Sequence, residues 1–418
     1  MNRASAGRRD SRSDCLVEVE ARTKGGIVVE LASKVKSLYG SDITGLAVSV
    51  LEALGVPHAR VTIQDEGALP FVLAARLESA VRRIQPSLSK EYLPDPARQL
   101  FSPPGKEHLR RSRLYLPGNQ PKFFPNAGLH RPDCVILDLE DSVHPDEKDA
   151  ARLLVRNALR VVDFGYAERM VRINQGREGI TDLHCLVPVM PDTVVVPKCE
   201  SAEQIIEVDR EIQRIRREVK ISREILILPI IESALGIHNA YEVASASKRI
   251  CALAIGLEDY TADIGAERTV QGRESLYARQ ALVNAAKAAG VQALDSVFSD
   301  VDDVEGLAES CREARAFGFD GKGCIHPRQI RIIHQAFAPT GKDIAWAQQV
   351  TLAFEAAQKS KMAVVAVGSR MIDPPVVRRA QRDLALAVAS GVVPSNWRAD
   401  ITLQSAPMDS ETVLPEGE

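Results

Sequence analysis

The chain has 418 residues, 45% of them hydrophobic, which is enough for two or three domains with a sizeable core. The 53 Lys and Arg residues nearly balance the 56 Asp and Glu residues, so the composition gives no electrostatic basis for binding nucleic acid or an anionic membrane. No apolar run reaches the ~18 residues of a membrane span. The seven cysteines form no C-x-x-C pair, which is typical of reduced core residues in a cytoplasmic protein.

Residues 1–85 have the pattern of a small α+β domain. The first residues are polar and basic, and alone they predict only a frayed terminus before the first strand. After them, segments in which apolar residues recur at every second position predict strands, and segments with apolar residues at helical spacing predict helices. The expected elements are strands at 15–21 and 26–32, a helix at 42–55, a strand at 59–67 and a helix at 69–84.

A proline-rich segment, residues 86–109, follows this domain. Proline holds the chain extended, so the segment predicts a semi-rigid linker and a domain boundary. Its prolines are Pro86, Pro94, Pro96, Pro103 and Pro104.

From residue 110 to 338, short apolar runs alternate with amphipathic helices. Strands that are apolar throughout indicate a parallel sheet covered on both faces. Eight runs favour a (β/α)8 TIM barrel. An open doubly wound sheet is the alternative, but no glycine-rich nucleotide fingerprint follows the first strand. The runs begin at Leu114, Cys134, Met170, Thr193, Leu226, Cys251, Ala293 and Gly323.

Nearly every run ends in a polar side chain. In a barrel the strand ends converge at one mouth, where the active sites of such enzymes lie, so this ring favours catalysis. Helix capping is the structural alternative, and it suits Asp141 and Asp300 best. The ring contains Asp138, Glu140, Asp141, Arg172, Asn174, Lys198, Glu232, Glu258, Asp259, Asp295, Asp300 and His326.

Glu232 and Asp259 end consecutive strands, ~4.8 Å apart in such a sheet, and could share one ion. Carboxylates without nearby His or Cys favour Mg²⁺. Whether Glu258 or Asp259 points inward stays open, because neighbours on a strand face opposite sides.

Arg172 has the donor geometry for a carboxylate or an enolate oxygen. Lys198 could instead form a Schiff base, but that needs a lowered pKa, so the metal route is favoured.

Residues 339–391 predict a C-terminal helical segment, and residues 392–418 a polar tail. Within the segment a glycine turn precedes Asp373, which alone would be a turn residue or a helix cap before Pro374. The segment is well placed to act as a lid.

Several motifs resemble the citrate lyase beta chain / malyl-CoA lyase family, part of the HpcH/HpaI aldolase–citrate lyase superfamily. The resemblance covers residues 110–390 and implies an Mg²⁺-dependent barrel, often a homotrimer, that cleaves or forms a C–C bond beta to a thioester. The motifs are RSRLYLPGNQP, VILDLEDSVHPDEKDAAR, VRIN, VVPKCES, PIIESALG, GLEDYTADIGA, GFDGKGCIHPRQI and GSRMIDPPVVRRAQ.

The resemblance also implies roles for single residues. Glu232 and Asp259 match the metal ligands, and Arg172 matches the arginine that neutralises the substrate and the developing enolate. Asp373 matches an acid/base carboxylate delivered by a neighbouring subunit. Arg111 and Lys198 are further candidates for substrate binding. The implied reaction cleaves a 3-hydroxy-carboxyacyl thioester to an acetyl thioester and oxaloacetate, glyoxylate or pyruvate.

Residues 1–85 resemble the acyl carrier (gamma) subunit of citrate lyase. That family carries a phosphoribosyl-dephospho-CoA group on a serine shortly before an aspartate. The matching stretch here is Asp10-Ser11-Arg12-Ser13-Asp14. One inserted residue makes Ser11 the attachment site, whereas an alignment without a gap puts Arg12 there and predicts an inactive carrier.

The expected function is therefore that of a citryl-thioester lyase, acting on its own carrier or on citryl-CoA, with an alpha-type acyltransferase subunit as a further partner. A second hypothesis keeps the chemistry but uses free malyl-CoA or citramalyl-CoA, with the N-terminal domain structural. A third is a non-catalytic carrier or assembly protein, which the complete set Arg172, Glu232, Asp259 and Asp373 disfavours.

Overall fold

The computed structural model describes residues 2–96, 104–359, 365–367 and 370–398. Parts of the predicted linker and of the C-terminal segment, and the tail beyond residue 398, lie outside these ranges. The chain divides into two compact units, Met1–Phe337 and Ala338–Glu418. Among the described residues, none of the helices has the length and apolar character needed to cross a membrane.

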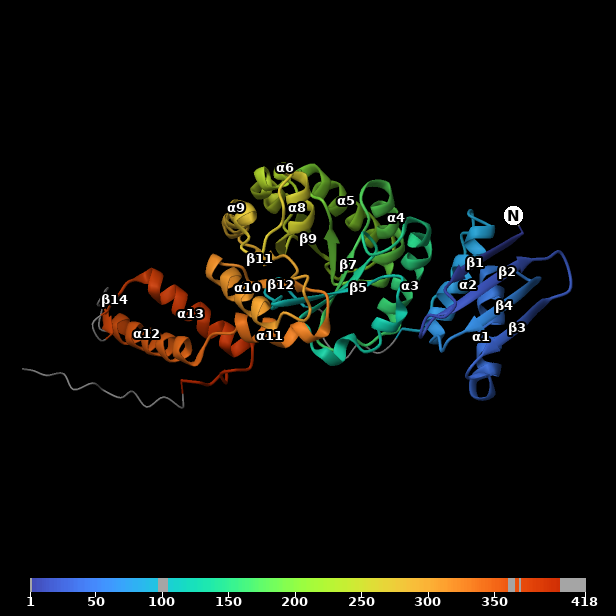
Figure 1. Cartoon of the computed structure of the whole chain (residues 1–418), viewed down its shortest axis with the longest axis horizontal. Helices are drawn as coiled ribbons and strands as arrows, with labels where there is room; N and C mark the ends of the chain where they lie inside the picture. The colour runs from blue at the N-terminus through green and yellow to red at the C-terminus, as the bar shows by residue number, and fades with distance from the viewer. Residues whose placement is uncertain (1, 97–103, 360–364, 368–369, 399–418) are drawn as a thin grey trace, which may run out of the picture. The chain divides into compact units, whose positions relative to one another are not determined.

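The N-terminal part of the first unit is a four-stranded sheet with two helices (Figure 1). The strand order is β1-β2-β4-β3, with β3 parallel to β4 and the other pairs antiparallel. Apolar side chains of β2 and β4 form one core with those of the two helices. The elements are β1 Arg3–Gly7, β2 Cys15–Ala21, β3 Ile27–Ser33, α1 Lys36–Leu54, β4 Ala59–Asp65 and α2 Pro70–Ile84.

Two features of this sheet differ from the expectation. The residues expected to fray form β1, an edge strand of small residues in which Ala6 is the buried member, so apolar alternation was too weak to reveal it. The strands expected at 15–21 and 26–32 follow each other in the chain but are not paired with each other, because β4 lies between β2 and β3.

The second part of this unit is a closed barrel of parallel strands, which confirms the predicted TIM barrel. Each predicted apolar run contributes one strand. Alternate residues point into the barrel, where Ile136, Met170 and Leu228 belong to its inner core. The strands are β5 Ser112–Pro117, β6 Cys134–Asp138, β7 Glu168–Arg172, β8 Thr193–Val196, β9 Leu226–Ile231, β10 Ala252–Ile255, β11 Gln292–Asp295 and β12 Gly321–Cys324.

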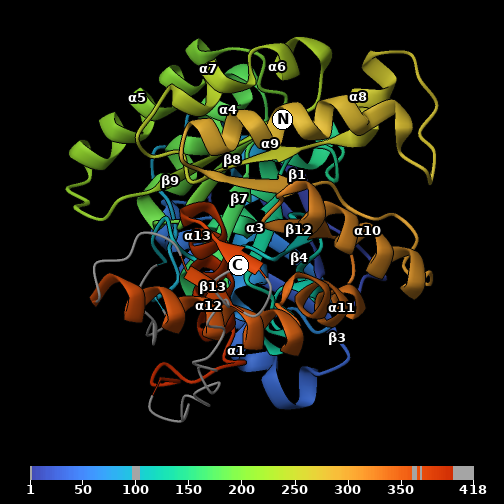
Figure 2. The ribbon, with the colours of Figure 1, turned by 90° about the vertical axis from the view of Figure 1, so that its left-hand side faces the viewer.

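Helices surround the barrel strands (Figure 2). Their apolar faces pack on the outward side chains of the strands in the largest core cluster. The α-helices are α3 Lys148–Val161, α4 Gly176–Leu186, α5 Ala202–Glu218, α6 Ala234–His238, α7 Ala240–Ser245, α8 Leu257–Asp263, α9 Leu276–Ala288, α10 Val304–Phe317 and α11 Pro327–Phe337. Short 3-10 helices are η1 Pro121–Phe123, η2 Ala127–His130, η3 Pro145–Glu147, η4 Val187–Val189 and η5 Arg273–Ser275.

Helix α2 of the sheet domain packs against α3 of the barrel. The Arg156 guanidinium donates to Glu78 at 2.7 Å, and both side chains are buried. The Asn157 side-chain amide donates to the Phe71 carbonyl oxygen at 3.1 Å. These paired buried groups tie the two domains together within one compact unit.

The second unit is a small helical body. Helices α12 and α13 pack together around buried Ile344, Val350 and Leu384, beside a two-stranded antiparallel sheet. Its elements are α12 Gly341–Lys359, β13 Val365–Val367, β14 Arg370–Ile372 and α13 Pro374–Ala389.

Candidate active site

A cavity of about 450 Å³ opens where the barrel strands end. We call it the mouth pocket. Because the strands are parallel, side chains from the ends of β6, β7, β9 and β10 converge there, as the ring of polar residues predicted. It is lined by Arg113, Tyr115, Pro117, Asp138, Asp141, Ser142, Arg172, Ile230, Glu232, Ile255, Gly256, Leu257, Glu258, Asp259, Ser296, Val297, Gly323 and Ile325.

Arg172, the last residue of β7, is held in a fixed orientation. Its Nε and Nη2 atoms donate to the two oxygens of Asp138 at 2.6 and 2.7 Å, and its guanidinium lies 5.5 Å from the ring centre of Tyr115. Burial disfavours the charged form of Arg172, but the bond to Asp138 outweighs it and raises the pKa. Arg172 is therefore a permanent, well-oriented cation on the pocket wall.

Glu232 follows β9 and is almost fully buried. One of its oxygens accepts the Lys198 backbone N–H at 2.7 Å. Lys198 has φ +50°, a left-handed conformation that is costly for a residue with a side chain and that concentrates at functional sites. A side chain at Gly256 would put Cβ 2.3 Å from the Glu232 carboxylate, so glycine is required there.

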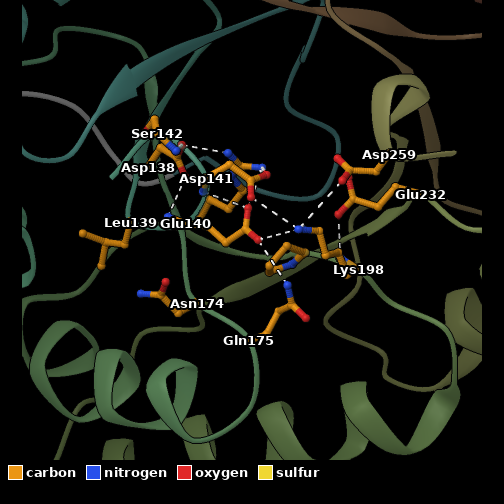
Figure 3. Close-up of polar contacts among 12 residues, drawn as sticks. Asp138, Leu139, Glu140, Asp141, Ser142, Asn174, Gln175, Lys198, Glu232 and Asp259 are labelled. Carbon is orange, nitrogen blue, oxygen red and sulfur yellow. Dashed lines mark hydrogen bonds and ion pairs between the residues drawn. The ribbon is translucent and has the colours of Figure 1, made fainter. Parts of the chain in front are cut away.

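Glu232 and Asp259 form a carboxylate pair that Lys198 approaches from one side (Figure 3). Burial and the negative charge of Asp259 raise the pKa of Glu232 to about 7. The Lys198 ammonium lies 3.8 Å from Asp259 and is closer to Glu140, at 3.1 Å. The pair therefore gains stability from any further positive charge that binds beside it.

The Lys198 side chain lies between two groups of carboxylates at the mouth. Its ammonium contacts Glu140 and Asp141 on one side and Asp259 on the other (Figure 3). Burial lowers its pKa, but the bond to Glu140 and the charges of the carboxylates outweigh burial and raise it. A protonated lysine is a poor nucleophile, so this environment argues against the Schiff-base alternative.

Asp259, in the first turn of α8, is the member of the Glu258–Asp259 pair that lies beside Glu232 and Lys198 (Figure 3). Glu258 is more exposed and forms an ion pair with Arg268. The open choice between these neighbours is thereby resolved in favour of Asp259 as the partner of Glu232.

A second group of potential metal ligands lies at the opposite end of the barrel. His108, Cys134 and Glu168 offer ligand atoms within 4.8 Å of one another. However, Arg110 neutralises Glu168 at 2.8 Å, and burial holds the pKa of the Cys134 thiol well above its ordinary value. This group suits a closed structural network rather than a cation.

Sequence comparisons agree with this architecture. The model of the HpcH/HpaI aldolase/citrate lyase family matches residues 111–327. The chain is 40% identical over 294 residues to citrate lyase subunit beta of Leuconostoc mesenteroides subsp. cremoris, which covers 69% of this chain and 97% of that protein. The chain belongs to the HpcH/HpaI aldolase/citrate lyase family. Like its relatives named lyases, it is a carbon–carbon lyase.

Other relatives match a larger share of the chain, and a second family model matches its N-terminal domain. Citramalyl-CoA lyase of Mus musculus is 33% identical over 343 residues, covering 79% of this chain and 97% of that protein. CitE from Mycobacterium tuberculosis, in complex with magnesium, acetoacetate and coenzyme A, gives a TM-score of 0.54 at 33% identity and covers 68% of this chain and 98% of that chain. The model of the malonate decarboxylase delta subunit (MdcD) matches residues 1–84. The predicted family and its fusion to a carrier-type domain are confirmed.

Not every predicted site residue of this lyase lies at the mouth. Arg111 precedes the first residue of β5, at the amino end of the strand, and donates to Asp133 at 2.8 Å. Arg113, two residues later, lines the mouth pocket together with Arg172. The sequence analysis did not single it out. The period-two spacing of a strand, which places Arg113 on the same face as Tyr115, could have indicated it.

Asp373 belongs to the second compact unit. It is the N-cap of α13, and its carboxylate accepts the Val376 N–H at 3.2 Å. This local geometry is that of a helix cap before Pro374. The acid/base role stays a prediction.

Ser11 lies at the tip of the hairpin that joins β1 and β2. The turn is closed by the Asp14 N–H donating to the Ser11 carbonyl at 3.1 Å, and Arg12 is exposed between them. Buried Asp14 forms a two-point ion pair with Arg76, which also donates to the Asn119 carbonyl oxygen at 3.2 Å. Asn119 follows the carboxyl end of β5, so the hairpin is anchored at the mouth end of the barrel.

Proposed function

We propose that this lyase cleaves a citryl-type thioester to an acetyl thioester and oxaloacetate, with Mg²⁺ as its cofactor. The observation that carries the proposal is the carboxylate pair of buried Glu232 and part-exposed Asp259, which lies in one pocket with the fixed cation Arg172. This arrangement combines a cation site with an oxyanion site, as C–C cleavage through an enolate requires.

The donor set fits Mg²⁺. Glu232 and Asp259 supply carboxylate oxygens from adjacent strand ends, and nitrogen or sulfur ligands are absent from the residues that line the pocket. The relative CitE was solved with magnesium. When bound, the ion would supply polarisation of the hydroxyl and carboxylate oxygens of the keto-acid half of the substrate.

Charge stabilisation, proton transfer and substrate binding are assigned to side chains of the protein itself. As the C–C bond breaks, the substrate hydroxyl loses its proton to solvent and becomes the keto oxygen, and Arg172 donates to the thioester oxygen onto which the negative charge moves. Asp138 keeps the guanidinium oriented through two bonds, so little reorganisation is needed. Asp373, brought by a neighbouring subunit, protonates the carbon of the acetyl half, and in the condensing direction its carboxylate removes that proton. Lys198 contributes to substrate binding.

The N-terminal domain is proposed to carry the substrate. In this proposal residues 1–85 are the carrier, 86–109 the linker, 110–338 the lyase, 339–391 the segment with Asp373, and 392–418 a tail. Ser11 would hold a phosphoribosyl-dephospho-CoA arm, and it is a partly exposed turn residue. The anchoring of the hairpin at the mouth end of the barrel supports short-range delivery of the tethered thioester.

The assembly is proposed to be a cytoplasmic homotrimer or higher homo-oligomer, with an alpha-type acyltransferase subunit as partner. The competing function is cleavage of free malyl-CoA or citramalyl-CoA, which the match to citramalyl-CoA lyase of Mus musculus favours. In that case Arg12 occupies the attachment position and the N-terminal domain is structural.

Intact-mass analysis of the protein from its native cell separates these functions. A phosphoribosyl-dephospho-CoA adduct on residues 1–20 supports the carrier, and Ser11→Ala should remove it. An unmodified protein that turns over free malyl-CoA would support the competing function instead. A protein inactive on citryl-, malyl- and citramalyl-thioesters would contradict both.

A further inference from the structure

The mouth pocket contains a second arginine, Arg113, that is not paired with a carboxylate. Its side chain is 1% exposed and lines the pocket. One Nη atom donates to the Asp295 carbonyl oxygen at 2.7 Å, while Nε and the other Nη atom are buried with no partner among the described residues. A buried guanidinium with unmet donors is costly, so the site is incomplete without an acceptor.

Asp295, whose backbone carbonyl accepts from Arg113, has a carboxylate that is already neutralised. Asp295 accepts from Lys322 at 2.7 Å and pairs with Arg279 at 3.2 Å. Arg279 also bonds Glu313 at the surface. The Asp295 carboxylate therefore has no charge left to balance Arg113. This wall carries excess positive charge, whereas the opposite wall, around Glu232 and Asp259, carries excess negative charge.

Small residues separate the two walls. Gly323 is the register partner of Arg113 on β12, and Ser296 and Gly256 follow the ends of β11 and β10. All three line the pocket with Arg113. A side chain at Gly323 would put Cβ 2.7 Å from Val297, so glycine keeps the space beside Arg113 free.

We infer that Arg113 binds the distal carboxylate of the keto-acid half of the substrate, and so selects a dicarboxylic keto acid such as oxaloacetate over pyruvate or glyoxylate. A citryl thioester has this second carboxylate at the end of a carboxymethyl group, a citramalyl thioester has a methyl group in place of that carboxymethyl group, and a malyl thioester has hydrogen there. Nε and Nη1 point to different sides of the guanidinium, so a substrate carboxylate oxygen would satisfy one of the two unmet donors with a charge-assisted bond. This inference rests on the proposed function, because it assumes that the keto-acid half is held at Glu232 and Asp259.

Binding of the product keto acids tests the inference without turnover. In calorimetric titrations with Mg²⁺, the wild-type protein should bind oxaloacetate ~10- to 100-fold more tightly than pyruvate, the range of one charge-assisted contact. Arg113→Met should remove the preference, and Arg113→Lys should restore part of it. Equal binding of the two acids by the wild type overturns the inference even if the variants do not fold.

Steady-state cleavage of citryl-CoA and citramalyl-CoA provides the second test. Arg113→Met should lower kcat/KM for citryl-CoA by ~10- to 100-fold relative to citramalyl-CoA. The control Arg268→Gln removes one positive charge from a residue outside the pocket lining and should leave that ratio unchanged. Equal loss on both substrates in a folded Arg113→Met protein overturns the distal-carboxylate role while leaving the proposed reaction intact. Failure of the wild type to cleave either thioester overturns the proposed function, and the keto-acid preference still tests Arg113 separately.

Discussion

The domain junction and the barrel mouth are built from the same residue types, arginines and carboxylates. They differ in how fully the charge of each carboxylate is balanced by a cationic partner. At the junction, buried Glu78 is bonded by Arg156 and by Arg82, and every carboxylate oxygen has a donor. At the mouth, Glu232 and Asp259 lack such close pairing: the Lys198 ammonium is 3.8 Å from Asp259, and burial together with the charge of Asp259 raises the pKa of Glu232 to about 7 despite the opposing charge of Arg172.

This difference separates structural from functional charge. A balanced buried pair gains nothing from an outside ion, so it holds two domains together and stays closed. An unbalanced pair is stabilised by a ligand of opposite sign. The mouth contains both kinds of imbalance, with excess negative charge at Glu232 and Asp259 and an unmet guanidinium at Arg113. Substitutions in each region should therefore have different effects.

The largest effect is expected for Glu232→Ala. Removing one of the two proposed cation ligands should lower Mg²⁺-dependent cleavage of every thioester tested by ~10³-fold or more, about 4 kcal/mol of transition-state stabilisation. Steady-state assays over a range of Mg²⁺ concentrations measure this loss. Glu258→Gln is the matched control, because Glu258 is paired with Arg268, and it should keep activity within a few-fold. Unchanged activity in Glu232→Ala would contradict the proposal that Glu232 is a metal ligand.

At the junction, Arg156→Met should lower the free energy of unfolding by about 3 kcal/mol, because Glu78 stays buried with one partner fewer. The folded variant should keep the wild-type kcat. Denaturant unfolding and the activity assay check the two parts. Adding Glu78→Gln should recover part of the lost stability. A variant that is as stable as the wild type, or one that is folded but inactive, contradicts a purely structural role.

Glu232 also gives a pH test in Mg²⁺-free protein. Its pKa is raised from 4.5 to about 7 in the folded state, so its contribution to stability is greatest at low pH and is lost as the pH rises through 7. Glu232→Gln cannot ionise. Between pH 5 and 8 the wild type should therefore lose about 2 kcal/mol of unfolding free energy relative to this variant. Denaturant titrations in EDTA measure the difference, and parallel curves for the two proteins would argue against a raised pKa.

The smallest effect is expected at an exposed pair. Arg60 donates to Glu30 at 2.6 Å across neighbouring strands, but both side chains are about half exposed. Arg60→Gln should change the free energy of unfolding by no more than about 0.5 kcal/mol. A shift as large as that of Arg156→Met would mean that burial is not what separates the two kinds of pair.

The barrel could be predicted from sequence because each strand is a short apolar run that ends in a polar residue, and parallel strands bring those ends together. The edge strand β1 could not be predicted, since its small residues Ala4 and Ala6 bury little apolar surface. The position of β4 between β2 and β3 depends on a parallel crossover through α1, which local alternation does not encode.

At the site, motif position indicated Glu232, Asp259, Arg172 and Lys198, and the structure brings these four residues together. Arg111 could not be separated from Arg113 by motif alone, because residues two apart share one strand face, and only the position of the start of β5 shows that Arg111 lies at the amino end and Arg113 nearer the pocket. The choice between Glu258 and Asp259 likewise depended on the start of α8.

Product analysis of citryl-CoA cleavage tests the central claim most directly. With Mg²⁺, the purified protein should release acetyl-CoA and oxaloacetate in equal amounts, EDTA should stop the reaction, and Mg²⁺ should restore it. Cleavage that continues at full rate in EDTA would contradict the role assigned to Glu232 and Asp259. Cleavage of malyl-CoA or citramalyl-CoA but not of citryl-CoA would contradict the proposed substrate.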